Sequence, residues 1–395
     1  MLQLRLLPRA ARREQTRSDL AASHQATLPP RSTRPVTITM SSPGTSTPPA
    51  GTPPGTGAVS APVSGPPYPP ATAQVGGVPT PVPDAAVSGV LLALFLAGAA
   101  VHMAIFQRNR RIKHKFIFSA LLFYFCVIRA VALTLRIAWS ATAATRGNVS
   151  LAIASGVLVS AGVLLLFIVN LILARRVLRA RLPRVGWGGV VGWVWTFLIG
   201  SVVAVLIMLV ICFVHSLFTL DMSAREKERQ VLLFAGVYLT VMAFLPVPVV
   251  LVAWFVPIMM ARPGKKGHEL EEFGTGRMGT KVALLVGTSL LLTLGAGFRA
   301  AVNFVPRPPT QPAWYHSKEA FYCFNFVIEV IVVYVFAIAR FDRRFHVPDG
   351  SSGPGDYARG AGVELGGIMD SSKAESALGA SAGEESYGGY GHPRM

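Results

Sequence analysis

The sequence contains seven apolar runs, and each is longer than the roughly 18 residues that indicate a membrane-spanning helix. In lipid, a spanning segment must satisfy its backbone hydrogen bonds internally, so runs of this length predict helices. We therefore expect an all-α membrane protein, a bundle of seven transmembrane helices. The runs cover residues 85–106, 116–139, 149–173, 189–218, 231–260, 282–304 and 320–341.

The composition agrees with a membrane protein. The chain is 52% hydrophobic and 14% charged, whereas soluble domains are about 25% charged. Its net charge of +18 could suggest nucleic acid, but the basic residues lie mostly in short clusters between the apolar runs, where they orient membrane helices. The expected partner is the lipid bilayer, and we expect no nucleic-acid partner.

The distribution of Lys and Arg predicts the orientation, because cytoplasmic loops are enriched in both. The loops after the first, third and fifth runs and the start of the C-terminal tail together hold eighteen, and the opposite side holds six. The N-terminus is therefore expected outside and the C-terminus in the cytoplasm, with the plasma membrane as the expected location. In the fifth run, Pro246, Pro248 and Pro257 predict a kink.

Both ends of the chain have the composition of disordered tails. Residues 1–36 hold seven arginines and two acidic residues, and 37–84 are rich in Pro, Thr and Ser. The arginine-rich start fits a disordered tail, a gene-model extension ahead of Met40, or a mitochondrial transit peptide, and the first two are favoured because no amphipathic period is visible. We expect three parts: a disordered tail over 1–84, a seven-helix domain over 85–345, and a Gly/Ser-rich acidic tail over 346–395.

The second run carries two arginines, Arg129 and Arg136, one heptad apart and hence on nearly the same helix face. An arginine costs about 2.5–3.5 kcal/mol at the centre of a bilayer, so it usually faces a protein interior or a water-filled cavity. Glu329 is the only acidic residue within the seven runs and lies at a similar depth to Arg129. We therefore predict an Arg129–Glu329 ion pair, with Arg136 extending to the outer headgroups.

Further polar residues near the outer ends of the sixth and seventh runs suggest a pocket between the second, sixth and seventh helices. Such a pocket would be a ligand site; the alternative is an ion pair that only fixes helix packing. The residues of this predicted intramembrane polar site are Arg129, Arg136, Arg299, Asn303, Tyr322, Asn325 and Glu329.

Other features of the sequence are weaker. Asn148 begins a glycosylation sequon in an expected outer loop. His102 and Asn170 are best explained by interhelical hydrogen bonds. The three cysteines lie within apolar runs, without metal-ligand spacing. The sequence has no phosphate-binding loop and no zinc motif, so we expect neither an enzyme nor a bound cofactor or metal.

The stretches 108–139 and 148–187 resemble a fungal family of uncharacterised seven-helix proteins that are often named family-C-like G-protein-coupled receptors. The resemblance covers about 85–345 and implies a seven-helix fold and a fungal membrane protein. The receptor motifs depart from the well-known classes: the third run ends in LILARRVL rather than an acidic-Arg-aromatic triplet, and the seventh contains neither Asn-Pro-x-x-Tyr nor the retinal-binding lysine of microbial rhodopsins.

These observations favour a receptor-like protein that senses an extracellular ligand and acts on a cytoplasmic signalling partner. Two alternatives stay open. One is a transporter or lipid-translocating exporter, against which the lack of a visible internal repeat counts modestly. The other is a structural or stress-response membrane protein without a ligand.

Overall fold

The computed structural model describes residues 65–68, 70, 72–112, 114, 116–142, 149–260 and 273–357. Within them the chain is helical and contains no strand, and seven helical segments are long and apolar enough to cross a membrane. The fold prediction is thus confirmed. We number these segments as spans 1 to 7; they cover Pro81–Arg111, Phe118–Thr142, Ser150–Arg181, Gly189–Ser216, Met222–Met259, Met278–Phe304 and Lys318–Ile338.

Four of the spans are single helices and three are interrupted. Spans 1, 2, 4 and 6 are α2 (Pro81–Arg111), α3 (Phe118–Thr142), α7 (Gly189–Ser216) and α10 (Met278–Phe304). Span 3 consists of α4 (Val149–Gly162) and α5 (Leu164–Arg181), and span 5 of α8 (Met222–Phe244) and α9 (Pro246–Met260). Span 7 consists of α11 (Lys318–Tyr322), the π-helical turn η2 (Cys323–Val327) and α12 (Ile328–Ile338). Short helices α6 (Pro183–Gly186), η1 (Trp314–His316) and α13 (Phe341–Arg344) lie at the ends.

The break in span 5 falls where the prolines predict it. The helix is interrupted at Leu245, and α9 starts at Pro246, with Pro248 and Pro257 further along. A proline has no backbone N–H to continue the ladder, so the chain bends there. The span is longer than the apolar run because α8 begins at Met222, two turns of charged helix before the run starts.

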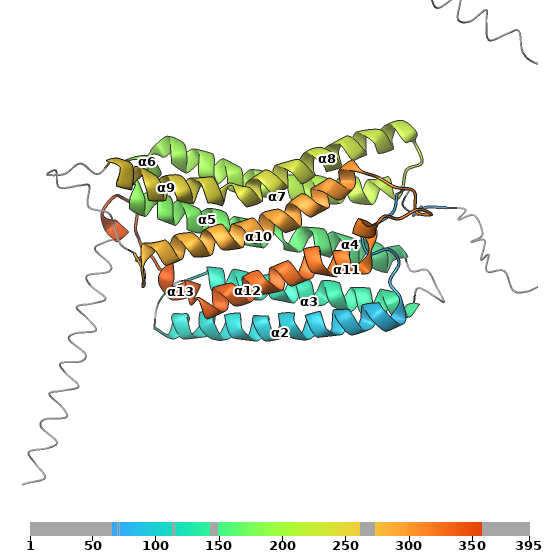
Figure 1. Cartoon of the computed structure of the whole chain (residues 1–395), viewed down its shortest axis with the longest axis horizontal. Helices are drawn as coiled ribbons and strands as arrows, with labels where there is room; N and C mark the ends of the chain where they lie inside the picture. The colour runs from blue at the N-terminus through green and yellow to red at the C-terminus, as the bar shows by residue number, and fades with distance from the viewer. Residues whose placement is uncertain are drawn as a thin grey trace, which may run out of the picture. The chain divides into compact units, whose positions relative to one another are not determined.

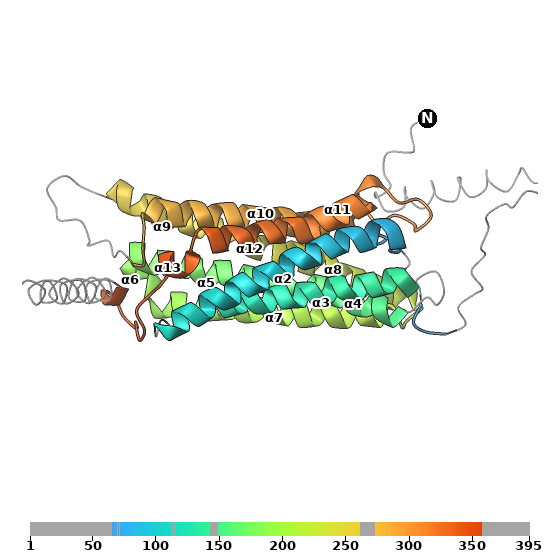
Figure 2. The ribbon, with the colours of Figure 1, turned by 90° about the horizontal axis from the view of Figure 1, so that it is seen from below.

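The spans lie side by side, with α2 and α3 along one edge of the bundle and α7 and α8 along the opposite edge (Figure 1). Seen from below, α9, α10 and α12 lie along one side of the bundle and α3 and α4 along the other (Figure 2). Between these edges, α5 packs against α3, α7, α9 and α10. Within an apolar 18-residue stretch of each span, half or more of the residues are buried in spans 2, 3, 6 and 7, with a maximum of 61% in span 3, whereas only 6% are buried in span 4. Span 4 is therefore the most lipid-facing helix.

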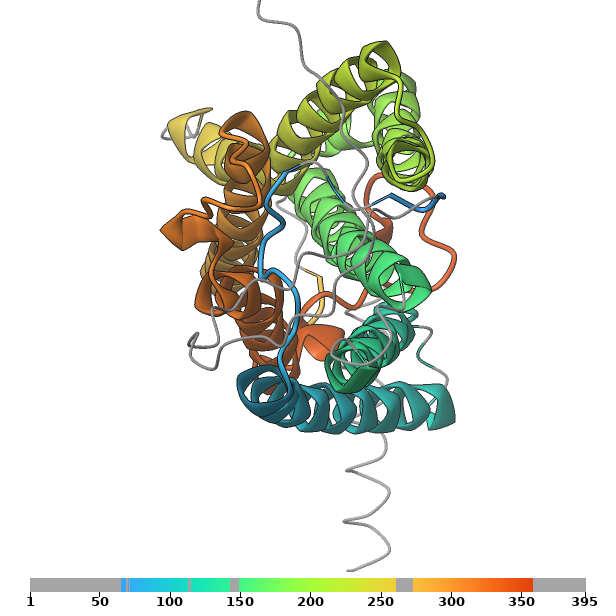
Figure 3. The ribbon, with the colours of Figure 1, turned by 90° about the vertical axis from the view of Figure 1, so that its right-hand side faces the viewer.

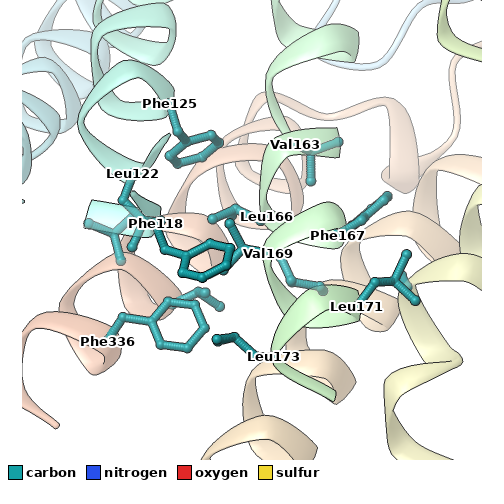
Figure 4. Packing of buried hydrophobic residues seen from close by; sticks show 14 of the residues in the cluster. Phe118, Leu122, Phe125, Val163, Leu166, Phe167, Val169, Leu171, Leu173 and Phe336 are labelled. Atoms are coloured by element: carbon teal, nitrogen blue, oxygen red, sulfur yellow. The ribbon is translucent and has the colours of Figure 1, made fainter. Parts of the chain in front are cut away.

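The core around α5 is built from aromatic and aliphatic side chains of α3, α5 and α12, which interlock in Figure 4. Leu122, Phe125, Leu166 and Phe336 are fully buried, and Phe167 is 1% exposed. Close packing of this kind supplies the attraction between membrane helices, because lipid tails are as apolar as the side chains. This core lies around α5 and α12.

We call the end of the bundle at which α2 begins the outer end, following the Lys/Arg count, and the opposite end the inner end. Residues 65–68, 70 and 72–80 lie across the outer end (Figure 3). Three backbone hydrogen bonds attach them there: Tyr68 N to Leu217 O at 2.7 Å, Ala73 N to Arg307 O at 2.8 Å and Gly76 N to His316 O at 3.0 Å.

The tails over 1–84 and from 346 onward were expected to be disordered, but the parts of them that the structure describes contact the bundle. At the inner end, Tyr357 is 2% exposed and its ring lies 5.5 Å from Trp187 and 5.6 Å from Phe273. Composition suggested disorder because both segments are poor in apolar residues, yet single aromatic and backbone contacts fix the residues next to the bundle. The residues of both tails that are further along the chain from the bundle lie outside the described residues.

Candidate functional site

The predicted contact between Arg129 of α3 and Glu329 of α12 is present. Arg129 Nη2 donates to Glu329 Oε1 at 2.5 Å, and the two side chains are 0% and 2% exposed. Leaving either charge alone in the membrane would be costly, and a charge-assisted hydrogen bond of this kind offsets part of that cost. The residues are 200 positions apart in the chain, so the contact ties span 2 to span 7.

Arg129 also fits into the interruption of span 3. Its Nη1 donates to Val159 O at 2.7 Å and to Leu158 O at 3.3 Å, in the last turn of α4. Gly162 makes room for the guanidinium: a Cβ at this position would lie 3.1 Å from Arg129 Cζ. The side chain that the sequence matched only to Glu329 therefore holds three spans together.

Arg299 of α10 reaches the same carboxylate from the other side. Arg299 Nη1 lies 3.9 Å from Glu329 Oε1 and donates to Asn325 Oδ1 at 3.2 Å. Asn325 lies in the π-helical turn η2 and donates to Phe321 O at 2.9 Å. Isolated π turns inside α-helices are frequent at functional sites. Arg129, Arg299 and Glu329 form what we call the arginine triad.

The expectation for Arg136 was wrong. Arg136 is 3% exposed and does not extend to the headgroups; it pairs with Asp84 Oδ1 at 2.9 Å. Tyr322 completes the cluster, accepting from Arg136 Nε at 3.0 Å and donating to Asp84 Oδ1 at 2.7 Å. Lys318 Nζ lies 2.5 Å from the second carboxylate oxygen of Asp84. Asp84 was missed because it immediately precedes the apolar run, whereas the helix begins at Pro81 and includes it.

A cleft of about 490 Å³ opens near the outer end, but its walls are not those expected. Sequence reasoning placed a pocket between spans 2, 6 and 7, where the triad and the Asp84 cluster instead fill the space with buried contacts. The cleft lies between spans 3, 4, 5 and 6, and residues 70 and 72–75 contribute a wall. Of the seven predicted site residues, Arg299 and Asn303 line it; Arg129, Arg136, Tyr322, Asn325 and Glu329 do not.

The cleft combines a charged rim with apolar walls. The rim holds Met222 and Glu226, both exposed, so the cleft communicates with the outer surface. The walls and the inner part of the cleft are formed by Val157, Val163, Phe167, Leu209, Val210, Phe213, Leu232, Leu239, Ala296 and Ala300. A mostly apolar concavity with a few polar groups is the usual form of a small-molecule site.

Fully buried side chains lie on the inner side of the cleft. Leu171 and Leu173 of α5 and Leu285 of α10 are 0% exposed. Asn170 of α5 donates to Ser289 Oγ of α10 at 2.9 Å; elsewhere in the bundle, His102 Nε2 of α2 lies 3.2 Å from Val333 O of α12. Both residues make the interhelical contacts that the sequence suggested. The cleft therefore ends on packed helices.

The remaining expectations concern modification and metal binding. Asn148 lies outside the described residues. Cys126, Cys212 and Cys323 are free thiols. Within the described part of the chain, no three His, Cys, Asp or Glu side chains are grouped so that they could hold a metal ion. The arrangement offers binding through arginine and apolar contacts.

Comparison with known proteins adds one finding. Residues 265–346 match a family described as "Protein of unknown function (DUF3112)". The match includes α10, α11, η2 and α12, and so contains Arg299, Asn303 and Glu329. No match was found among curated proteins or among solved structures. The chain is an integral membrane protein by its seven spans, and the matched description adds no activity.

Proposed function

We propose that this protein is receptor-like and binds a small extracellular ligand in the cleft between spans 3, 4, 5 and 6. The observation that carries the proposal is a cleft that is open at the expected outer end and closed by packed helices on its inner side. A receptor needs a site with one opening; a transporter in its outward-open state has the same opening, so a flux measurement separates the two. The resemblance to the fungal receptor-like family agrees with this proposal.

A binding event in the cleft has a direct route to the inner end along α5. Phe167 lines the cleft near the start of α5, and Arg176, two and a half turns further, donates to Phe345 O at 2.5 Å. The Arg176 guanidinium also lies 4.7 Å from the centre of the Phe118 ring. A shift of α5 would therefore move α13 and the segment that follows it, where a cytoplasmic partner would act.

The proposal can be tested by filling the cleft. Ser160 lines the cleft, is exposed, and donates to Gly156 O one turn earlier at 3.0 Å. Ser160→Trp should occupy the space without breaking a contact between helices. Thr196 is a matched control, because it is also exposed and donates to Gly192 O one turn earlier at 3.1 Å, but it lies nearer the start of α7 and does not line the cleft.

The measurement is the unfolding temperature of the full chain in nanodiscs with a panel of soluble cations, anions, zwitterions and neutral compounds. A bound ligand raises that temperature by mass action. We expect at least one class to stabilise the wild type and the Thr196→Trp variant but not Ser160→Trp. Stabilisation by no class, or equal stabilisation of both variants, would contradict the proposal. Flux of the stabilising compound into vesicles that contain the protein would show that it is a transporter and not a receptor.

A further inference from the structure

The arginine triad carries more positive than negative charge. Two guanidinium groups share one carboxylate, with distances of 2.5 Å and 3.9 Å to the same oxygen, Glu329 Oε1. An arginine is always charged in a protein, so the three side chains have a net charge of +1. An unneutralised charge inside a bilayer is unfavourable and usually faces water or an anion.

Arg299 is the member of the triad that can receive an anion. Arg129 is fully buried, and its two terminal nitrogens donate to Glu329, Leu158 and Val159. Arg299 lines the cleft, and its side chain is 24% exposed. A guanidinium has five N–H donors, and the hydrogen bond to Asn325 uses one. Within the described part of the chain, the other donors of Arg299 have no hydrogen-bond partner, and the residue lines the cleft.

The acidic residues that line the cleft already have other partners. Glu226 lies 3.7 Å from Arg229, and Glu228 is hydrogen-bonded to His215. Arg225, which also lines the cleft, donates to Thr219 O at 2.9 Å. None of these contacts neutralises Arg299. The polar side of the cleft therefore favours a negatively charged group.

The apolar walls select the rest of the ligand. One turn inward from Arg299 along α10 is Ala296, and Phe167 and Leu239 line the same region from α5 and α8. Phe213 and Leu209 of α7 line the cleft across from α10. A small hydrophilic anion would leave these surfaces in contact with water, whereas an alkyl chain would cover them and gain about 25 cal/mol for each Å² removed from water.

We propose that the cleft binds a medium-chain carboxylic acid as its anion, with the carboxylate on Arg299 and the alkyl chain against the walls formed by α5, α7 and α8. A carboxylate matches the planar donor fork of arginine, and its single charge neutralises the triad. This inference rests on the proposed function, since it names the class of ligand that the same cleft takes.

The test measures binding of radiolabelled decanoate to the full chain in nanodiscs of neutral phosphatidylcholine, with empty nanodiscs subtracted. Unlabelled competitors are decanol, decylammonium and acetate, which change the charge of the head group or remove the chain. We expect saturable decanoate binding that Ser160→Trp abolishes. Decanol and decylammonium lack the carboxylate that would bind Arg299, and acetate lacks the chain that would cover the apolar walls. Each should therefore compete at least about tenfold more weakly than decanoate.

Two variants locate the head group. Arg299→Gln should lower the affinity for decanoate at least about tenfold, whereas Arg307→Gln, a charge removed from an exposed position outside the cleft, should change it less than about twofold. Equal competition by decanol and decanoate would overturn the carboxylate assignment on the wild type alone, even if Arg299→Gln fails to fold. Unchanged affinity in a folded Arg299→Gln protein would also overturn it.

Failure of this inference is distinguishable from failure of the proposed function. If decanoate does not bind but another compound of the panel stabilises the protein in a way that Ser160→Trp abolishes, the ligand class is wrong and the receptor-like site stands. If no compound depends on Ser160, both are wrong. Decanoate that binds only through the bilayer would give equal signals with Ser160→Trp and the wild type.

Discussion

Arginines near the outer half of this bundle occur in two different settings. Beside α2 and α12, Arg129 and Arg136 are buried and each is paired with a carboxylate at 2.9 Å or less. On the cleft side, Arg299 is half-buried and shares a carboxylate that already has a closer partner. The first setting closes the space between helices with satisfied charges, and the second leaves a cation facing an open cleft. The number of carboxylates does not distinguish them, because Asp84 is also shared, with Lys318. The distance does: Arg136 lies 2.9 Å from its own oxygen of Asp84, whereas Arg299 lies 3.9 Å from the oxygen that Arg129 already binds.

The largest loss of stability is expected from a substitution of Arg129. Arg129→Leu removes three contacts and leaves Glu329 with only the more distant Arg299, so we expect the free energy of unfolding to fall by about 3–5 kcal/mol. Thermal and denaturant unfolding in detergent micelles would measure it, with Arg307→Leu as the control. A loss below about 1 kcal/mol would mean that the buried pair does not stabilise the fold.

Exchanging the charges of Arg129 and Glu329 tests the contribution of the same ion pair. Arg129→Glu combined with Glu329→Arg restores an ion pair but not the hydrogen bonds to Leu158 O and Val159 O. The double variant should therefore recover only part of the surface expression and stability lost in either single variant. Complete recovery would show that the contacts with span 3 contribute little, and no recovery would show that the pair itself does not matter.

The second buried pair should have an intermediate effect. Asp84→Asn removes the charge that Arg136 and Lys318 share, but Lys318 is 28% exposed and can turn to water. We expect a loss of about 1.5–3 kcal/mol, the range for hydrogen bonds to charged groups. Unfolding of Asp84→Asn beside Ser88→Ala, a neighbour that lies 2.9 Å from the Tyr322 hydroxyl, would separate loss of charge from loss of a neutral contact.

Arg299 should behave differently from both. Arg299→Gln removes the surplus cation and leaves the Arg129–Glu329 pair intact, so the stability of the unliganded protein should change by less than about 1 kcal/mol. The same unfolding measurements apply. A loss as large as that of Arg129→Leu would place Arg299 with the buried, structural arginines and remove the contrast between the two regions.

The smallest effect is expected at His316, beside the cleft and outside the spans. Burial and the positive charge of Arg307 hold the pKa of His316 below its ordinary value of 6.5. The unfolded chain therefore binds a proton at a higher pH than the folded chain, and stability falls as the pH drops below about 6.5. The decrease in unfolding temperature between pH 7.5 and 5.5 should be smaller in His316→Asn, and an equal decrease would contradict the assignment.

The seven spans could be predicted because hydrophobic length is a local property of the sequence. The prolines likewise located the break at Leu245. The Arg129–Glu329 contact was predictable for a different reason: only one acidic residue lay within the apolar runs, so a buried arginine had one candidate. Because only one acidic candidate was available, similar depth along two helices was enough to predict a contact between residues 200 positions apart in the chain.

The cleft could not be predicted in the same way. Its walls come from four spans and from residues 70 and 72–75, and the sequence does not show which faces of α7 and α8 meet. Arg136 was misplaced because hydropathy marks the start of the apolar run and not of the helix, so Asp84 was assigned to a tail. The position of the cleft and the partner of Arg136 both depend on interhelical packing, and a single sequence carries little information about that packing.

Residues 70 and 72–75 form one wall of the cleft; the backbone bond of Ala73 fastens this wall, and those of Tyr68 and Gly76 hold the chain on either side of it. A ligand seated on Arg299 would therefore lie beside a strip of chain that is not part of any span. Such a strip can slow the escape of a ligand, and differences in affinity among related complexes arise mainly in the dissociation rate. The residence time at this site is thus coupled to the segment that joins the N-terminal tail to the membrane.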